Sequence, residues 1–279
     1  MWIFCGGMQR SGSTLQFQIT AQLVEEAGLG TRMEWVEFEQ WPELRKKYTD
    51  FEGWKVFKNH TCTEEMMLEF HRQNAAGVYV YRDLRDVIVS TMKKYSTTFD
   101  LLQDMKFLQN CINQYYKWTG LPQVYVSRYE DIMENLPVEV ENIANHLKID
   151  LGQERYRSIA SSLSIKKQKK RINEAIENGD LCQGYVKGSY FNPHTILHTN
   201  HINSGAVNGW KNILTKQQVA LIEHQTGNWL VAHGYELSQT SFQRGWNIFL
   251  IKATRALEIF NFSLRTNLGR IRNKLTRRL

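Results

Sequence analysis

The sequence predicts an α/β fold of three layers, in which a mostly parallel central sheet carries helices on both faces. Short runs rich in Val, Ile, Tyr, Phe and Trp alternate along the chain with longer segments of helical periodicity. A turn rich in Gly, Ser and Thr follows the first of these runs and precedes the first helical segment. Such a strand–loop–helix unit directs backbone N–H groups toward one point, which suits a phosphate ligand.

The individual elements follow from the same patterns. The apolar runs place strands near residues 2–5, 54–58, 77–81 and 123–127, with a further candidate at Met33–Phe38. Helical periodicity extends over residues 13–27, 63–74, 84–95, 99–119, 130–147, 152–177 and 215–233. Residues 183–209 are the longest stretch with neither pattern, and a loop of that length is usually functional or mobile.

Length and composition fit one large domain with an appendage. The chain has 279 residues, of which 42% are apolar and 23% charged. We expect a domain at residues 1–240 and a basic amphipathic helical tail at 241–279, where apolar residues recur at steps of three and four. The stretch 246–279 holds eight Lys or Arg and one acidic residue, which accounts for the whole net charge of +7. The neutral remainder carries no nucleic-acid recognition motif, which argues against a nucleic-acid partner.

Cysteine spacing and the chain start predict a cytoplasmic protein. The four cysteines are far apart and form no C-x-x-C pair, which indicates buried thiols rather than a disulfide framework or a zinc site. A strand begins at Trp2, so no signal peptide is visible, and no apolar run reaches 18 residues. The basic tail could hold the protein at the inner face of a membrane. The alternative is that its apolar stripe packs on the body or on a second subunit.

The first turn has the spacing of a Walker A loop, with one exception. Gly7, Gly12 and the pair Ser13-Thr14 match G-x-x-x-x-G-K-[ST], but Ser13 occupies the lysine position. The positive charge stands three residues earlier, at Arg10. The fold is therefore expected to be P-loop-NTPase-like, with a loop that binds a phosphate and is poorly suited to ATP hydrolysis.

Charged residues follow two of the predicted strands. Lys58 and His60 lie two residues apart at the end of one strand, so they share a face at the ligand-binding edge. A histidine there can act as a general base and a lysine can stabilise transferring charge; the alternative is a helix-capping histidine and a solvated lysine. Arg82 ends the next strand and can fork around a phosphate, with Ser90 about two helical turns further on. The alternative is an Arg–Asp surface pair and a solvated serine.

Two later segments complete the pattern. Tyr129 follows the last predicted strand and begins a helix. The Gly-rich run Gly205–Asn212 would let backbone amides approach a ligand, and Trp210 could close over it. A plain helix N-cap at Thr215 with Trp210 as a core anchor is the alternative.

In this order and at this spacing, the motifs resemble those of the cytosolic-type sulfotransferases that use 3′-phosphoadenosine 5′-phosphosulfate (PAPS). The family's 5′-phosphosulfate loop is similar to Arg10–Thr14, its K-x-H to Lys58–His60, and its 3′-phosphate motif R-x-x-R/K-D-V-x-x-S to Arg82–Ser90. Its Y-E-D and G-x-V-G-x-W-K-N motifs are similar to Tyr129–Asp131 and Gly205–Asn212. The resemblance covers roughly residues 1–237 and leaves out the tail.

The resemblance implies site residues, with three departures. It implies a catalytic set of His60, Lys58 and Arg10. It implies that the nucleotide is bound by Arg10, Ser11, Gly12, Ser13, Thr14, Arg82, Ser90, Tyr129, Gly205 and Trp210. Arg10 replaces the lysine of cytosolic members, as in many carbohydrate sulfotransferases; Leu15 replaces an aromatic residue; and Asn203-Ser204 replace an Arg-Lys pair, which leaves more of the 3′-phosphate to Arg82 and Ser90.

The implied reaction is transfer of a sulfuryl group from PAPS to a hydroxyl or amine, on a glycan or a lipid-linked sugar, with release of adenosine 3′,5′-bisphosphate (PAP) and without a metal. Residues 92–120 and 183–204 would line the acceptor, with His194, His198 and His201 solvated or facing it. A P-loop kinase or NTPase is one alternative, opposed by the missing lysine and by the lack of a strand-end carboxylate for Mg²⁺. An inactive nucleotide-binding module of the same fold is the other.

Overall fold

The computed structural model describes the chain apart from residues 36, 184–189, 193–195, 199–205 and 255–279. The chain divides into two compact units, Met1–Trp210 and Lys211–Leu279. The first unit is built on a parallel sheet, and the described part of the second is helical apart from turns.

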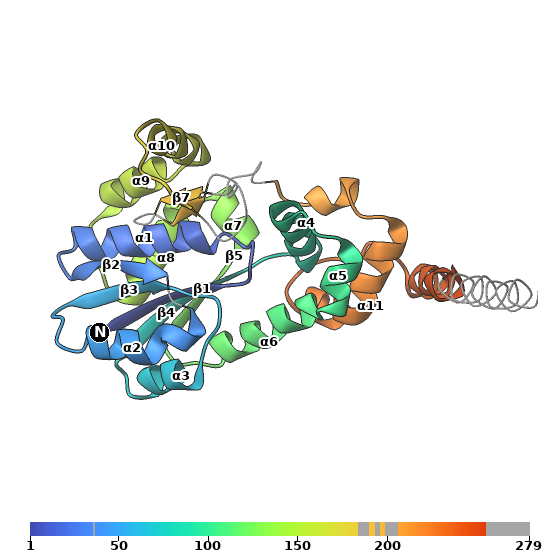
Figure 1. The fold of residues 1–279 in the computed structure, drawn as a ribbon, viewed down its shortest axis with the longest axis horizontal. Coiled ribbons are helices and arrows are strands. Elements are labelled where there is room, and N and C mark those ends of the chain that lie inside the picture. Colours follow the sequence, from blue (N-terminus) through green and yellow to red (C-terminus); the bar gives the residue numbers. More distant parts are fainter. Residues whose placement is uncertain (36, 184–189, 193–195, 199–205, 255–279) are drawn as a thin grey trace, which may run out of the picture. The chain divides into compact units, whose positions relative to one another are not determined.

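The central sheet has five parallel strands in the order β2-β3-β1-β4-β5 (Figure 1). Their bounds are β1 (Trp2–Gly7), β2 (Gly30–Trp35), β3 (Trp54–Lys58), β4 (Ala75–Tyr81) and β5 (Val124–Arg128). The predicted α/β class and four of its strands are confirmed. The candidate at Met33–Phe38 is displaced, because β2 pairs with β3 from Gly30 onward. An added Cβ at Gly30 would lie 2.0 Å from the Trp54 carbonyl oxygen, so this glycine serves close strand pairing rather than a turn.

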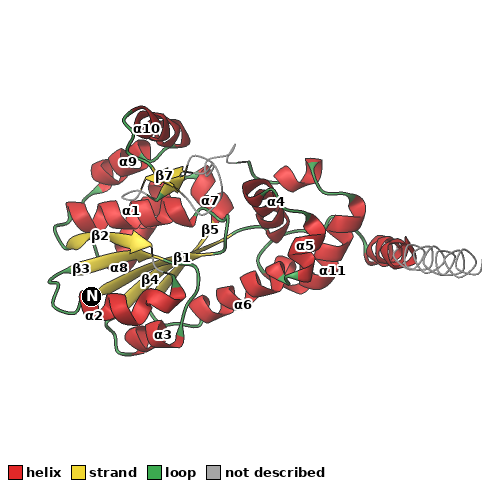
Figure 2. Cartoon of the chain, viewed as in Figure 1, coloured by secondary structure: helices red, strands yellow, loops and turns green. Residues whose placement is uncertain are grey.

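Helices connect the strands in the expected alternation (Figure 2). Those of the first unit are α1 (Ser13–Glu26), α2 (Trp41–Lys47), α3 (Glu64–His71), α4 (Leu84–Tyr95), α5 (Phe99–Asp104), α6 (Phe107–Thr119), α7 (Tyr129–Glu134), α8 (Leu136–Leu147), α9 (Gln153–Ser162) and α10 (Ile165–Glu177), with a 3₁₀ turn η1 (Phe38–Gln40).

Three predicted helices are each divided into two. The segment 99–119 is interrupted before α6 by Lys106, whose φ is 52°. The segment 130–147 is broken at Asn135, whose side chain caps α8 by accepting a hydrogen bond from the Val138 amide. The segment 152–177 is broken where Ser164 takes an extended conformation before α10. Hydrophobic periodicity continued across these breaks, so the sequence pattern did not show them.

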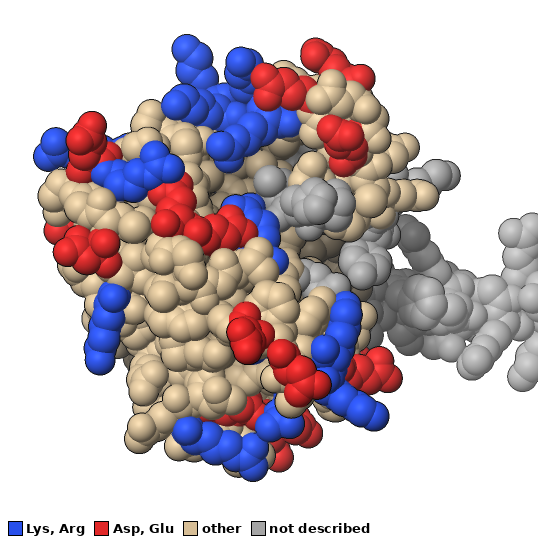
Figure 3. Space-filling view, turned by 90° about the vertical axis from the view of Figure 1, so that its left-hand side faces the viewer, with Lys and Arg blue, Asp and Glu red and all other residues tan. Residues whose placement is uncertain are grey.

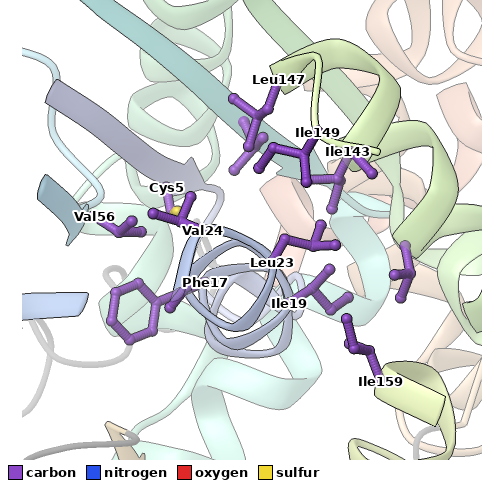
Figure 4. Close-up of a cluster of buried hydrophobic side chains, with 14 of the residues drawn as sticks. Cys5, Phe17, Ile19, Leu23, Val24, Val56, Ile143, Leu147, Ile149 and Ile159 are labelled. Atoms are coloured by element: carbon purple, nitrogen blue, oxygen red, sulfur yellow. The ribbon is translucent and has the colours of Figure 1, made fainter. Parts of the chain in front are cut away.

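The two faces of the sheet are packed differently. Ile3, Cys5 and Val56 face aliphatic residues of α1, α8 and α9 in one buried cluster (Figure 4). Trp2 and Phe4 alternate with them along β1 and face the other side, where both rings contact Trp41 at 5.0 Å between centroids. α2 was not predicted, yet it supplies Trp41, which is fully buried.

The parallel register brings the strand ends to one edge. Cys5 pairs with Lys58, and Gly7 pairs with Val80, two residues before Arg82. Tyr81 pairs with Arg128, immediately before Tyr129. The loop after β1 and the residues that follow β3, β4 and β5 therefore converge where parallel sheets bind ligands.

Residues 182–198 include a small antiparallel sheet that was predicted as irregular. Its strands are β6 (Cys182–Gln183), β7 (Tyr190–Asn192) and β8 (Leu197–His198). Runs of two or three residues are too short to produce a sequence pattern. His194 and His201 lie outside the described residues. Cys5, Cys62 and Cys111 are buried as expected, whereas the prediction is wrong for Cys182, which is exposed because it lies on this small sheet.

The second unit contains α11 (Lys216–Ala232) and a helix over residues 241–254. Thr215 and Gln218 form the capping box of α11, and the Glu223 carboxylate accepts hydrogen bonds from Ser238 and Gln239 before the next helix. The tail helix starts five residues before Trp246, and residues 255–279 lie outside the described chain. Among the described residues, no helix is long and apolar enough to span a bilayer.

The charge of the first unit is locally uneven although its sum is near zero. Lys and Arg side chains gather at the top of the face in Figure 3, over α10. Lys166, Lys167, Lys169, Lys170 and Arg171 are all exposed there. This cluster is a second basic region besides the tail, which total charge does not reveal.

Candidate active site

The loop after β1 leads into α1 with its first amides available. Ser11 is buried and its hydroxyl lies 2.6 Å from the Met8 carbonyl oxygen and 2.9 Å from that of Val80. Its backbone N–H also donates to Met8, so Ser11 holds the loop and its amide is not available to a ligand. The amides of Gly12, Ser13 and Thr14 have no backbone acceptor among the described residues. Because the first turn of α1 contains no acidic residue, this N-terminus suits an anion.

Two glycines make room for this loop. Gly12 has φ 90°, and an added Cβ there would lie 2.9 Å from the Tyr129 ring. At Gly7, an added Cβ would lie 2.8 Å from the Cβ of Ser13. Larger residues would therefore push the loop away from the helix start and from Tyr129.

Arg82 is anchored at the end of β4 by several oxygens. Its guanidinium donates to the carbonyl oxygens of Arg10 at 3.2 Å and Ala206 at 2.7 Å, and lies 3.5 Å from the Asp86 carboxylate. Its Cζ atom lies 4.2 Å from the centre of the Tyr129 ring. The buried Nε atom of Arg82 has no partner among the described residues. The guanidinium thus packs against an aromatic ring and donates to two loop carbonyls, while its Nε–H has no partner among the described residues.

Asp86 connects this arginine to the late Gly-rich loop. Its carboxylate accepts hydrogen bonds from the amides of Asn208 and Trp210, both at 2.9 Å. Trp210 is buried and stacks on Arg85, whose Cζ lies 4.2 Å from the ring centre. Burial raises the pKa of Asp86 although Arg82 and the two amides oppose that rise. Gly205, the other residue predicted from this loop, lies outside the described residues.

Lys58 and His60 are placed side by side under Trp35. The Lys58 Nζ atom lies 4.1 Å from the Trp35 ring centre, and the His60 ring lies 5.0 Å from the same ring. Burial lowers the pKa of Lys58 to about 7, and the neighbouring charge of Arg10 adds to this effect. Burial also lowers the pKa of His60 to about 3, with Lys58 contributing next. His60 is therefore a neutral imidazole at pH 7.

The hydrogen bond of His60 fixes its tautomer. Its Nδ1 atom lies 2.6 Å from the Gly7 carbonyl oxygen. A carbonyl can only accept, so Nδ1 carries the proton and Nε2 keeps its lone pair. The Trp118 indole donates to the His60 carbonyl oxygen at 3.1 Å, which holds the residue from the other side. A neutral imidazole with an available Nε2 lone pair is the form that can accept a proton.

Arg10 links the loop to α4. It has φ 67°, and its Nε donates to the Ser90 hydroxyl at 3.0 Å. Burial lowers the pKa of Arg10, and the charge of Arg82 adds to that effect. Arg10 thus lies close to both other predicted cations, because its carbonyl oxygen accepts from Arg82 and its charge helps to lower the pKa of Lys58.

Two residues of the site escaped the sequence patterns. Trp35 lay in the displaced strand candidate, so its position over Lys58 and His60 was not visible. Asp86 stood inside the quoted motif but was not assigned a role. Among the described residues, no group of three or more His, Cys, Asp or Glu side chains could hold a metal ion.

Comparison with known families decides the class of this fold. The sulfotransferase domain family matches residues 3–231. The chain belongs to the sulfotransferase family. Comparison with curated protein sequences gives no match.

Solved sulfotransferase-like structures share the architecture of the enzyme. Mouse sulfotransferase SULT7A1 complexed with PAP has a TM-score of 0.62 and 14% identity, covering 90% of this chain and 88% of that one. Retinol dehydratase with androsterone and inactive cofactor PAP has a TM-score of 0.56 and 17% identity, covering 85% and 82%. Retinol dehydratase with retinol and PAP has a TM-score of 0.56 and 18% identity, covering 86% and 83%. At these identities the likeness concerns the fold.

Proposed function

We propose that this sulfotransferase moves the sulfuryl group of PAPS to a hydroxyl or amine of its acceptor at the edge of the sheet formed by the ends of β1, β3 and β4. The observation that supports this most directly is that Lys58 and His60 lie next to the loop that carries Arg10. The amides of Gly12, Ser13 and Thr14 at the end of this loop have no backbone acceptor among the described residues. The structural neighbours that contain PAP, the product of PAPS, are consistent with this donor.

The two ends of the donor would be held by different groups. The amides of Gly12, Ser13 and Thr14, with Arg10 and Lys58, suit the 5′-phosphosulfate, because they supply donors and charge at a helix N-terminus. Arg82 and Ser90 suit the 3′-phosphate, with Tyr129 packed beneath the guanidinium. Gly205 and Trp210 complete the proposed set; Trp210 acts through the Asp86-bound loop.

Catalysis would divide between base and cations. The acceptor oxygen or nitrogen attacks sulfur and forms a new bond while the bond from sulfur to the bridging phosphate oxygen breaks. His60 Nε2 takes the acceptor proton, because Nδ1 is already protonated. The negative charge that develops on the 5′-phosphate is stabilised by Lys58, Arg10 and the loop amides. Lys58, with a pKa of about 7, can also deliver a proton to this leaving group.

A sulfation assay with labelled PAPS tests these roles. Extracts of the source organism supply the acceptor, and identification of the labelled product names it. We expect His60→Ala and Arg10→Ala to sulfate this acceptor with most of the wild-type turnover lost. Near-normal turnover in both variants would exclude the proposed mechanism. Intact PAP binding without turnover on any acceptor would favour the inactive binding module.

We expect a glycan or a lipid-linked sugar as the acceptor, because Arg10 stands where carbohydrate enzymes carry arginine.

For the tail we propose contact with an anionic membrane surface. Phe242, Trp246 and Phe249 are exposed by 80%, 55% and 58% on the helix over 241–254, and most of the chain's excess cations follow them. Co-sedimentation with vesicles containing anionic lipid should require residues 241–279. If the protein truncated before residue 241 still bound vesicles but no longer formed a dimer, the helix would be assigned to self-association instead.

A further inference from the structure

Lys94, on the third turn of α4, is a buried cation that has no counter-ion among the residues the structure describes. Its exposed fraction is 8%, and its Nζ atom has no hydrogen-bond partner among the described residues. The structure also gives it no ion pair within the described chain. Burying an ammonium group without a partner costs free energy of folding. A lysine at such a position is therefore explained by a role in binding rather than by stability of the fold.

The location of Lys94 connects it with the proposed site. It follows Ser90 by four residues, so both side chains lie on one face of α4 about one turn apart. Ser90 binds the Arg10 guanidinium and is only partly buried, which shows that this face borders the loop. Burial lowers the pKa of Lys94 to about 8, and the charge of Arg10 contributes next. Thr97, three residues further, also has a buried hydroxyl without a partner among the described residues.

The donor does not account for this lysine. The proposed 3′-phosphate ligand Arg82 precedes α4, whereas Lys94 lies near the other end of that helix, beyond Ser90. Ser90, one turn before Lys94 on α4, accepts a hydrogen bond from Arg10, the cation assigned to the sulfuryl end. A group bound by Lys94 would therefore lie on the side of Ser90 away from Arg82, beside the point of transfer.

We infer that Lys94 binds an anionic group of the acceptor, a carboxylate, sulfate or phosphate ester, and so selects acidic acceptors. This inference rests on the proposed function, because it takes the sulfuryl position from Arg10. A negative group there would compensate a lysine that has no counter-charge within the described part of the chain.

Binding to the PAP-saturated enzyme separates the acceptor from the donor. Calorimetry with two matched pairs of probes, glucuronate with glucose and 4-hydroxybenzoate with phenol, should show at least about tenfold tighter binding of the anionic members. Lys94→Met should abolish this preference, and Lys94→Arg should retain it. Lys93→Met is the matched control, since Lys93 is the exposed neighbour on the same helix, and it should leave the preference unchanged.

Each outcome decides the inference. Equal binding of the two members by wild type, or an unchanged preference in Lys94→Met, overturns it. A loss of PAP affinity of about tenfold or more in Lys94→Met assigns the lysine to the donor instead. Lys94→Met should also raise the Tm of the ligand-free enzyme, whereas a lower Tm would assign Lys94 to the fold. No PAP binding by wild type would overturn the proposed function itself, and this inference with it.

Discussion

The two ends of the proposed donor site differ in how their charges are compensated. At the β4 end, Arg82 already contacts two carbonyl oxygens, a carboxylate and an aromatic face. At the β3 end, Lys58 contacts an indole ring, forms no ion pair within the described chain, and has its pKa lowered. The charge of the first end is therefore compensated within the protein, whereas no described residue forms an ion pair with the second. We therefore expect the first to govern affinity and the second to govern turnover.

The largest effect should come from His60→Ala. Loss of the base should lower kcat about 10²–10⁴-fold. PAP affinity should stay within about threefold, because the imidazole faces the reacting group rather than the 3′-phosphate. Steady-state kinetics measures the change in kcat, and calorimetry on the same preparation measures the change in PAP affinity. His71→Ala, at an exposed histidine that ends α3, is the control. If PAP affinity fell by as large a factor as kcat, the assignment of affinity to one end of the site and turnover to the other would be contradicted.

Arg82→Ala should have the opposite effect, a larger loss of nucleotide affinity than of turnover. It should weaken PAP about 100-fold and AMP far less, because it removes the 3′-phosphate ligand and leaves Asp86 without its buried partner. Titration with both nucleotides measures the ratio. The control is Arg128→Ala, whose side chain is 31% exposed and pairs with Glu130. Equal losses for PAP and AMP would show that Arg82 does not read the 3′-phosphate.

Gly12→Ala tests the loop that both ends share. A side chain at φ 90° is strained by about 1–2 kcal/mol, and the new Cβ would also meet the Tyr129 ring. We expect a lower Tm and weaker PAP binding. Gly28→Ala is the matched control, since Gly28 has φ 66° but no atom within 4 Å of an added Cβ. Equal losses of PAP affinity in the two variants would show that the fit between loop and Tyr129 is unimportant.

The smallest effect is a proton taken up on binding. With a pKa of about 7, Lys58 is mostly neutral at pH 8, and the 5′-phosphate of PAP beside it favours the charged form. Binding of PAP at pH 8 should therefore absorb up to about one proton, and affinity should fall as pH rises through 7. Calorimetry in buffers of different ionisation enthalpy measures the uptake. The uptake should shrink in Lys58→Met and persist in Lys55→Met, because Lys55 lies at the other end of β3 with its Nζ atom over the Trp2 ring. No change in Lys58→Met would contradict the prediction.

Much of the site was predictable because motifs at strand ends are local in sequence. The spacing from Gly7 to Thr14 and from Arg82 to Ser90 marks the residues of the proposed site, and parallel pairing then brings the two segments together. Contacts between distant segments were not predictable. The contact of Trp35 with Lys58 and the hydrogen bond from Trp118 to His60 depend on tertiary packing, which the spacing of residues in the sequence does not show. Helix breaks at Lys106 and Asn135 also escaped, because a single capping residue leaves the periodicity intact.

The most direct test of the central claim is a calorimetric comparison of PAP, AMP and ATP–Mg²⁺ on the wild-type enzyme. The arrangement of Arg82 and the loop amides predicts that PAP binds about 100-fold tighter than AMP and that ATP–Mg²⁺ binds weakest. Tight binding of ATP–Mg²⁺ with no measurable binding of PAP would contradict the account and favour a nucleotide kinase or NTPase.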